Sequence, residues 1–389
     1  MSHIFSHTPE SLQEWAKGHG MPAFRAKQIL EWVYAKGVIE PTRMTNLSAL
    51  DRETLSREMR FLSGATLADS IATDGTRKLL VQWDAEGDVG GIATSLPVLN
   101  DTTRQTECVM IPSLEIGPNG QPTRRTACIS SQVGCPVGCK FCASGLSGLD
   151  GNLTAGRIVE QVWRLRSLLG PEPKTGEMQR ISNVVFMGMG EPLANFESVT
   201  SAVRTIAAPW GLGISARKIT ISTVGLPKYI DRLAREFDLP VTLALSLHAP
   251  SDDIRRQLIP WAEFTTIADL LASCQRWFEK TGREITLEYT LLRHVNDRRA
   301  HAELLAGHAK TLRANVNLIR YNEVKGMPFE RPTDEDVRVF QETLRSKGVN
   351  AHIRASRGRD IAAACGQLRH EHAAQAGDTA GDALSHKAD

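Results

Sequence analysis

Between Asn183 and Arg354 the sequence alternates repeatedly between strand-like and helix-like segments. The apolar strand-like runs span 183–188, 218–225, 241–248, 284–290, 315–320 and 350–354, and helical patterns span 154–169, 196–207, 227–237, 266–280, 297–312 and 334–347. Strand, helix and strand repeated in this way predict a parallel sheet with right-handed crossovers. Six such strands, with a cysteine-rich loop after an earlier one, predict an α/β fold built on a partial (β/α)6 barrel. Its chemistry is then expected at the carboxyl ends of the strands.

The segments before the barrel have a different character. Residues 1–60 predict a small helical domain, with helices that begin near Thr8, Pro22 and Leu47. Residues 61–126 hold strand-like runs within turn-rich sequence and predict a short β-rich linker. The barrel is expected over 127–368. Residues 369–389 lack apolar periodicity and are expected to form a disordered tail.

Three of the seven cysteines, Cys135, Cys139 and Cys142, have the spacing C-x3-C-x2-C within a loop that contains glycines. Three thiolates placed in this way can bind three corners of a cubane 4Fe–4S cluster, which usually has four cysteine ligands. The fourth iron stays open, and the amino and carboxylate groups of S-adenosylmethionine (SAM) can chelate it. The loop therefore predicts a radical SAM cluster.

Two other interpretations of this loop were weighed. A structural zinc site needs a fourth cysteine or histidine nearby, and the sequence after Cys142 offers neither until far along the chain. The other alternative is a chance grouping of buried thiols, which rarely gives this spacing.

Polar residues follow several of the predicted strands, where SAM would bind. Glu191 ends a Met-Gly-Met-Gly-Glu segment, in which glycines allow close approach of a ligand and the carboxylate can accept hydrogen bonds from an ammonium group. Ser222, Ser246 and His248 can hydrogen-bond the ribose and methionine parts of SAM, although a lone histidine is more often a core residue. Asn322 can pair with an adenine edge.

The remaining cysteines divide into two kinds. Small residues flank Cys365, which predicts an accessible thiol, whereas Cys108 in a strand and Cys274 beside aromatic residues of a helix are expected to be buried fillers. The total of seven is odd, and the amino terminus lacks the basic start and apolar core of a signal peptide. Together these features favour a reducing cytoplasm.

Composition and charge narrow the class of protein further. The chain has 389 residues, 41% hydrophobic and 23% charged, as is ordinary for a globular protein, and no apolar run approaches a membrane span. Residues 293–369 contain 15 lysines and arginines against nine acidic residues. This excess fits a surface that contacts phosphates, and it fits a solvated face almost as well.

The motifs together resemble the RlmN/Cfr family of radical SAM RNA adenine methyltransferases, over roughly residues 22–368. The matching segments are Cys-Ile-Ser-Ser-Gln-Val-Gly-Cys, Phe-Met-Gly-Met-Gly-Glu-Pro, Ser-Leu-His-Ala-Pro, His-Val-Asn-Asp and Asp-Ile-Ala-Ala-Ala-Cys-Gly-Gln-Leu. The last segment, with its accessory cysteine, separates this family from other radical SAM enzymes.

The resemblance implies methylation of an adenosine in 23S rRNA. The RlmN branch modifies carbon 2, also in some tRNAs, and the Cfr branch modifies carbon 8. One SAM methylates Cys365; a second, on the cluster, yields an adenosyl radical that activates the S-methyl group for addition to adenine. Cys128 then attacks the sulfur, which forms a transient disulfide with Cys365 and frees the product. Glu107 matches the family's proton acceptor, although a strand carboxylate is otherwise an ordinary surface group.

The same matching implies further contacts and partners. SAM is expected to contact Gly190, Glu191, Ser222, Ser246, Leu247, His248 and Asn322. The helical domain 1–60 resembles the family's RNA-binding extension. The expected partners are 23S rRNA, tRNA and an electron donor such as flavodoxin with its reductase, and the expected state is a monomer with no membrane association.

Some segments leave the branch and the activity open. Asn317-Leu-Ile-Arg-Tyr-Asn and Cys-Lys-Phe-Cys-Ala resemble Cfr as much as RlmN, and the linker over 87–125 is longer than is usual in the family. Gln-Val-Gly-Cys135 and Glu107-Cys-Val-Met-Ile-Pro favour RlmN, so carbon 2 is the expected target. The alternatives are a radical SAM enzyme for a peptide or small metabolite, in which Cys365 carries no methyl group, and a non-enzymatic iron–sulfur electron carrier with a fourth protein ligand.

Overall fold

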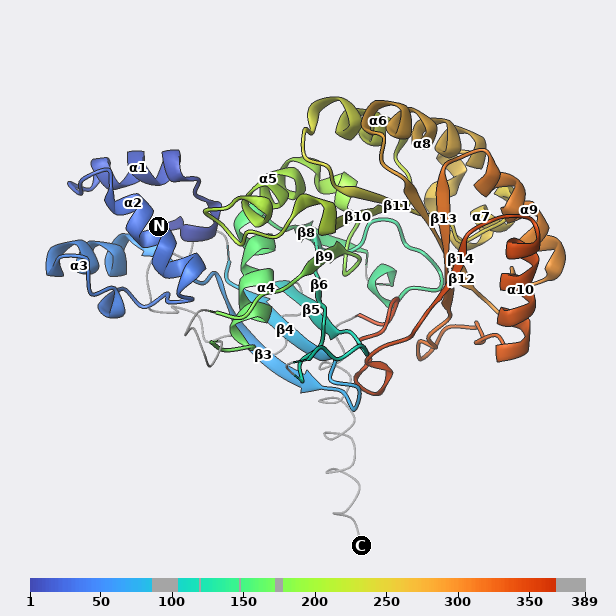
Figure 1. The fold of residues 1–389 in the computed structure, drawn as a ribbon, viewed down its shortest axis with the longest axis horizontal. Coiled ribbons are helices and arrows are strands. Elements are labelled where there is room, and N and C mark those ends of the chain that lie inside the picture. The colour runs from blue at the N-terminus through green and yellow to red at the C-terminus, as the bar shows by residue number, and fades with distance from the viewer. Residues whose placement is uncertain (86–103, 119, 147, 172–177, 369–389) are drawn as a thin grey trace, which may run out of the picture.

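The computed structural model describes residues 1–85, 104–118, 120–146, 148–171 and 178–368 (Figure 1). Residues 86–103 of the predicted linker and the predicted tail 369–389 lie outside the described residues.

A ten-stranded sheet organises the described part of the chain. Seven strands run parallel to one another: β6 (Arg125–Cys128), β9 (Asn183–Phe186), β10 (Ile219–Thr223), β11 (Thr242–Ser246), β12 (Ile285–Leu291), β13 (Ala314–Arg320) and β14 (Ala351–Arg354). Along the sheet they follow one another in sequence order, from β6 to β14. The predicted α/β partial barrel is confirmed.

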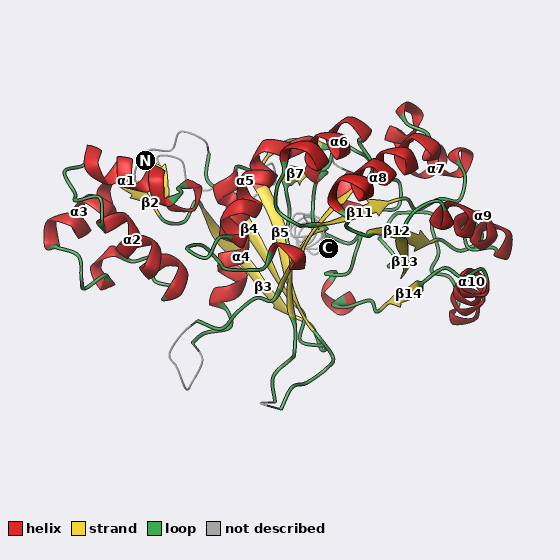
Figure 2. Ribbon diagram, turned by 45° about the horizontal axis from the view of Figure 1, so that its top comes forward, coloured by secondary structure: helices red, strands yellow, loops and turns green. Residues whose placement is uncertain are grey.

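Helices cover the outer side of the curved parallel part of the sheet (Figures 1 and 2). They are α4 (Ala155–Ser167), α5 (Phe196–Ala207), α6 (Pro227–Glu236), α7 (Asp252–Leu258), α8 (Ile267–Thr281), α9 (Arg299–Lys310) and α10 (Asp334–Ser346). Capping boxes begin α8 and α10, where Thr266 and Thr333 each bond the third residue of their helix. Only α7 was not predicted, because seven residues are too few to show a helical period.

The predicted β linker continues the same sheet. Strands β3 (Gly64–Ile71), β4 (Arg77–Trp83) and β5 (Gln105–Pro112) extend it antiparallel beyond β6. The predicted boundary at residue 126 falls inside β6. β5 is buried at every position from Gln105 to Met110, so both of its faces are covered, as expected for a strand inside the sheet.

The amino-terminal residues form a small module of their own. It contains α1 (Pro9–Gly18), α2 (Arg25–Leu30) continued by a π-helical turn (Glu31–Ala35), α3 (Ala49–Glu58), and the paired strands β1 (Ser2–His3) and β2 (Met59–Arg60). The module packs on α4: the rings of Phe5 and Trp163 lie 5.8 Å apart, and Trp163 Nε1 donates to the Val33 carbonyl at 2.9 Å. The two parts therefore share one hydrophobic core.

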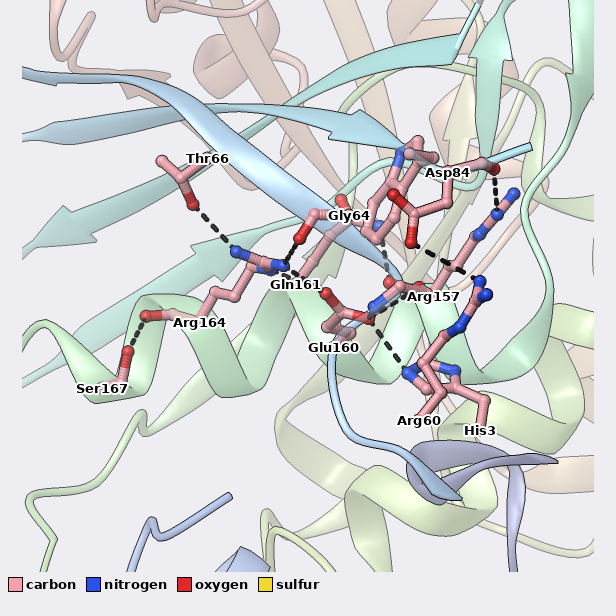
Figure 3. Close-up of polar contacts among 12 residues, drawn as sticks. His3, Arg60, Gly64, Thr66, Asp84, Arg157, Glu160, Gln161, Arg164 and Ser167 are labelled. Carbon is pink, nitrogen blue, oxygen red and sulfur yellow. Dashed lines mark hydrogen bonds and ion pairs between the residues drawn. The ribbon is translucent and has the colours of Figure 1, made fainter. Parts of the chain in front are cut away.

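A buried carboxylate, Glu160 of α4, joins this module to the sheet (Figure 3). Its Oε2 lies 3.0 Å from His3 Nε2 and accepts a hydrogen bond from Ser63 Oγ at 2.7 Å. Its Oε1 lies 2.6 Å from Arg164 Nη2, and Arg164 also donates to Thr66 Oγ1 of β3 at 2.9 Å. One side chain thus ties together the amino terminus, α4 and the antiparallel strands.

Among the described residues, the helices are too short or too polar to cross a bilayer.

Replacing Glu160 by glutamine should lower the free energy of unfolding by about 3 kcal/mol, because Arg164 loses its buried counter-charge. Burial by itself raises the pKa of Glu160, but the hydrogen bond from His3 and the charge of Arg164 hold this pKa below its usual range. The stabilisation is therefore present above the ordinary carboxyl pKa and is lost as the pH falls through the lowered value. Urea denaturation of both proteins, from neutral pH to about pH 3, measures the effect.

Glu236→Gln is the matched control. Glu236 pairs with Arg232 and Arg235 on the exposed face of α6, and its loss should leave the free energy of unfolding nearly unchanged. Equal destabilisation by the two substitutions would contradict the role assigned to Glu160.

Candidate active site

The predicted cluster loop comes after β6 and connects β7 (Gln132–Gly134) to its antiparallel partner β8 (Leu149–Asn152). In Figure 1 it is the teal segment within the curve of the sheet. Val137 and Phe141 are buried against Leu258 and Ile259, which follow β11 in the chain. This packing holds Cys135, Cys139 and Cys142 half-buried along one wall of a cavity.

The chemistry of these thiols suits a metal cluster. Burial raises the pKa of Cys135 to about 12 and that of Cys139 well above its usual value, and the charge of the neighbouring thiolates raises both further. Bound iron would compensate three thiolates in such a site. Among the described residues, no three His, Cys, Asp or Glu side chains converge on a single metal ion. A cubane cluster needs no such convergence, because its thiolates bind different irons.

The cavity lies at the carboxyl ends of the parallel strands and has a volume of about 910 Å³, its open mouth included. Five of the residues predicted to bind SAM line it together with the three cysteines: Gly190, Glu191, Ser222, Ser246 and His248. Leu247 and Asn322, also predicted to bind SAM, are not part of this lining. The structure therefore brings together most of the predicted SAM residues, from three successive strands.

Glu191 is buried and already holds two backbone groups. Its Oε1 accepts a hydrogen bond from Leu193 N–H at 3.0 Å, and its Oε2 accepts one from Val224 N–H at 2.8 Å. Burial raises the pKa of Glu191 to about 7, against the opposing effect of these hydrogen bonds. Because an ionised carboxylate accepts several hydrogen bonds, the side chain keeps the capacity to accept from an ammonium group.

The glycines before Glu191 also have a packing role. A Cβ on Gly190, whose φ is +100°, would lie 2.7 Å from Gln132 Cβ, and one on Gly188 would lie 2.7 Å from Ser130 Oγ. The segment therefore lies directly against the strand that leads to the cluster loop. Glycine is needed here because two segments of the chain pack closely together, in addition to the close approach of a ligand that the sequence predicts.

His248 is held in one tautomer by the backbone. Its Nδ1 accepts a hydrogen bond from Thr290 N–H at 3.0 Å, so in the neutral ring the proton is on Nε2. Burial lowers the pKa of His248 to about 3, and the charge of Arg255 lowers it further. The histidine thus lines the cavity as a neutral hydrogen-bond donor.

The two predicted SAM residues outside this lining have other neighbours. Leu247 is fully buried and its N–H donates to the Glu288 carbonyl at 3.1 Å. Asn322 follows β13, and its Nδ2 donates to the Cys365 carbonyl at 3.2 Å while its Oδ1 accepts from Arg331 at 3.3 Å. Asn322 lines a second cavity instead.

This second cavity has a volume of about 520 Å³, its opening included. Cys128, at the end of β6, lines it, and Cys365 lines both cavities. Burial raises the pKa of Cys128 to about 12, and the charge of a Cys365 thiolate would raise it further. Cys365 therefore stands between the cavity of the SAM residues and the cavity of Cys128.

The segment after β14, residues 355–368, carries Cys365 and is called the Cys365 loop below. It lies against the cluster loop: Ala143 N–H donates to the Gly366 carbonyl at 2.8 Å, and Ser144 Oγ donates to the Leu368 carbonyl at 2.8 Å. Cys108 and Cys274 are buried elsewhere in the core, as predicted.

Glu107 lies on β5 and lines neither cavity. It is only 3% exposed, so the alternative of an ordinary surface carboxylate is wrong. Lys78 Nζ of β4 lies 2.7 Å from Glu107 Oε1 and 3.3 Å from the Ala362 carbonyl, to which it donates. The carboxylate is thus linked through Lys78 to the Cys365 loop.

A carboxylate–guanidinium ion pair that was not predicted from the sequence also lines the first cavity. Glu288 of β12 and Arg354, the last residue of β14, both line it, with Glu288 Oε2 4.0 Å from Arg354 Nη1. The charge of the Cys365 thiolate raises the pKa of Arg354 above its usual value. The signal for Glu288 was present in the sequence: it is a carboxylate inside an apolar strand-like run.

Comparisons with known proteins agree with this geometry. Residues 3–60 match the model of the ribosomal RNA large subunit methyltransferase N-terminal domain, and residues 129–305 match that of the radical SAM superfamily. The chain is 40% identical over 368 residues to a probable dual-specificity RNA methyltransferase RlmN of Rhodopirellula baltica, covering 95% of this chain and 91% of that protein. It is 38% identical to the RlmN of Dichelobacter nodosus, covering 94% and 93%.

A solved structure has the same fold over nearly the whole chain. The crystal structure of a radical SAM methyltransferase from Sphaerobacter thermophilus superimposes with a TM-score of 0.83 at 38% identity, and covers 95% of this chain and 99% of that one. Radical SAM chemistry implies an iron–sulfur cluster and SAM as cofactors. The chain belongs to the RlmN family and is a radical SAM RNA methyltransferase.

Proposed function

We propose that the protein methylates carbon 2 of an adenosine in 23S rRNA and in some tRNAs. The observation that carries this proposal is the position of Cys365, which lines both cavities while Cys128 lines only the second. A thiol so placed can accept a methyl group on one side and present it on the other. The similarity to proteins named dual-specificity RNA methyltransferases supports two classes of RNA substrate.

The first cavity would hold SAM and a 4Fe–4S cluster. Cys135, Cys139 and Cys142 would ligate the cluster, which with bound SAM supplies the methyl group and the one-electron chemistry. Glu191 would accept hydrogen bonds from the SAM ammonium group, and His248 would donate one from Nε2. Gly190, Ser222, Ser246, Leu247 and Asn322 are proposed as the remaining SAM contacts, the last two by way of small shifts from their present partners.

The Cys365 thiolate would take the methyl group from one SAM. After the methyl carbon has been joined to adenine, Cys128 attacks the Cys365 sulfur. The bond from that sulfur to the modified nucleoside breaks with its electron pair going to the nucleoside, which takes up the proton lost by Cys128 to complete its methyl group, and a Cys128–Cys365 disulfide forms. Glu107, linked through Lys78 to the Cys365 loop, is proposed to accept the proton that adenine loses.

The module of residues 1–60 is proposed to contact the RNA. Its exposed Phe24 ring has the Arg25 guanidinium 5.1 Å from its centroid, an arrangement that suits stacking on a base beside a phosphate. A flavodoxin-type donor would reduce the cluster in the cytoplasm, and the seven cysteines, all unpaired, fit such a reducing compartment. A monomer is the proposed state.

Replacing Cys139 by alanine should remove the iron and sulfide that the purified protein carries, because two thiolates cannot hold the cluster. Cys128→Ala and Cys365→Ala should retain the iron and the sulfide, since these residues are proposed to take part in methyl transfer and disulfide formation and not to ligate the cluster. Cys274→Ala, a buried cysteine of α8, is the control for loss of any thiol. Iron and sulfide assays after anaerobic purification decide the matter, and equal iron in the Cys139 and Cys274 variants would contradict the ligand role.

Deleting the gene should remove 2-methyladenosine from 23S rRNA and from a subset of tRNAs, as measured by mass spectrometry of nucleosides. Complementation with wild type should restore it, and complementation with Cys365→Ala should not, because no thiol then carries the methyl group. Loss of 8-methyladenosine instead would assign carbon 8. Full activity of Cys365→Ala would exclude the proposed route.

Replacing Cys128 by alanine should leave RNA covalently attached to Cys365, because no second thiol remains to break the bond between sulfur and nucleoside. Denaturing electrophoresis followed by peptide mass spectrometry detects such an adduct. Cys108→Ala, which removes a buried thiol from the neighbouring strand β5, controls for general loss of activity. Free RNA and an unmodified Cys365 peptide in the Cys128 variant would rule out the resolving role.

A further inference from the structure

The Cys365 loop touches a part of the chain to which the sequence assigned no role. Figure 1 shows this loop, in red, beside the blue tips of β3 and β4, whose connecting turn contains Asp74. The contact joins the segment that carries Cys365 to the antiparallel extension of the sheet.

Asp74 is the centre of that contact. Its Oδ2 lies 3.1 Å from Arg357 Nε and accepts a hydrogen bond from Gly358 N–H at 3.0 Å. Its Oδ1 accepts from Thr76 N–H at 2.9 Å, which holds the carboxylate in place within its own turn. Arg357 Nη2 donates in addition to the Asp74 carbonyl at 2.7 Å and to the Pro112 carbonyl at 3.2 Å.

The geometry of the loop depends on close approach at this point. Gly358 has φ +64°, and a Cβ there would lie 2.8 Å from Thr76 Cγ2. Asp360 also reaches back to the turn, where its Oδ2 accepts from Thr73 N–H at 2.8 Å. The loop is therefore pressed against the turn by several bonds rather than by one.

The same loop is fixed on its other side by the barrel, through Asn322, Ala143 and Ser144 as described above. The bonds on the barrel side hold the chain at Cys365 and just after it, and the bonds to the turn hold Arg357, Gly358 and Asp360 before it. A thiol that must meet SAM on one side and RNA on the other has to be placed to within a fraction of an ångström. Bonds on only one side of the loop would leave it free to pivot.

We propose that Asp74 is a positioning residue for Cys365, acting through Arg357 and Gly358 without touching substrate or cofactor. This inference deepens the proposed function and rests on it for the meaning of the methyl-transfer step. The position of the thiol itself can be measured without any RNA or SAM.

The test uses Asp74→Asn in the anaerobically purified holoenzyme. Asparagine keeps the shape of the side chain but removes the charge that Arg357 needs. Two rates are measured by peptide mass spectrometry: S-methylation of Cys365 on addition of SAM, and alkylation of Cys365 by iodoacetamide. A loosened loop should slow the first and speed the second, each roughly five- to tenfold. The Cys365 thiol would no longer be aligned with SAM, but it would be more accessible to iodoacetamide.

Asp69→Asn is the matched control. Asp69 lies on the same hairpin and accepts from Arg77 Nε of the adjacent strand at 2.7 Å, with a side chain 32% exposed against 27% for Asp74. It should leave both rates at the wild-type value. Gly358→Ala is a second route to the same result, because its Cβ would meet Thr76. Asp360→Asn is a milder variant at the exposed edge, should the others unfold.

Unchanged rates in Asp74→Asn would overturn the proposal, and so would a decrease of both rates, since that would indicate lost thiol reactivity instead of lost position. If the wild type itself shows no S-methylation, the proposed function fails, while the alkylation rates still decide whether Asp74 positions the thiol.

Discussion

The site depends on the 2.8 Å hydrogen bond from Ala143 N–H to the Gly366 carbonyl, which joins two loops from opposite ends of the barrel sequence. The first loop carries the three spaced cysteines and the second carries Cys365. This bond, its neighbour from Ser144 to Leu368 and the bond from Asn322 to the Cys365 carbonyl fix Cys365, the proposed methyl acceptor, relative to the first cavity. The strands position each loop, but the contact between the two loops sets the distance from Cys365 to the three spaced cysteines.

Charge imposes a second constraint on the same region. Five cysteines lie near one another at the carboxyl ends of the strands, and burial makes the thiolates of Cys128, Cys135, Cys139 and Cys142 costly. Two guanidinium groups, the buried one of Arg255 and the half-buried one of Arg354, offset part of that cost. Arg255, whose Nη2 donates to the Val224 carbonyl at 2.6 Å, acts on Cys139, and Arg354 acts on Cys128 and Cys365. An iron–sulfur cluster would supply the remaining positive charge.

Much of this arrangement could be predicted from the sequence, and the rest could not, for physical reasons. Strong apolar periodicity gave the strands and helices of the barrel, and the cysteine spacing gave the cluster loop. The antiparallel strands were expected to form a linker, because local pattern does not reveal which edge of a sheet a strand joins. Pairs formed over long separations, such as Lys78 with Glu107 or Asp74 with Arg357, leave no local signal at all. Glu288 did leave one, as a lone carboxylate in an apolar run.

The buried link from Glu160 to His3 has a consequence for substrate choice. Because the amino-terminal module shares a core with α4, it is not a tethered arm that can search for RNA independently. If this module contacts RNA, as proposed, then its separation from the second cavity is a fixed length. An RNA must then offer its adenosine at that distance from the bound segment. Ribosomal and transfer RNA would both be accepted if each has this same distance between the bound segment and the target adenosine.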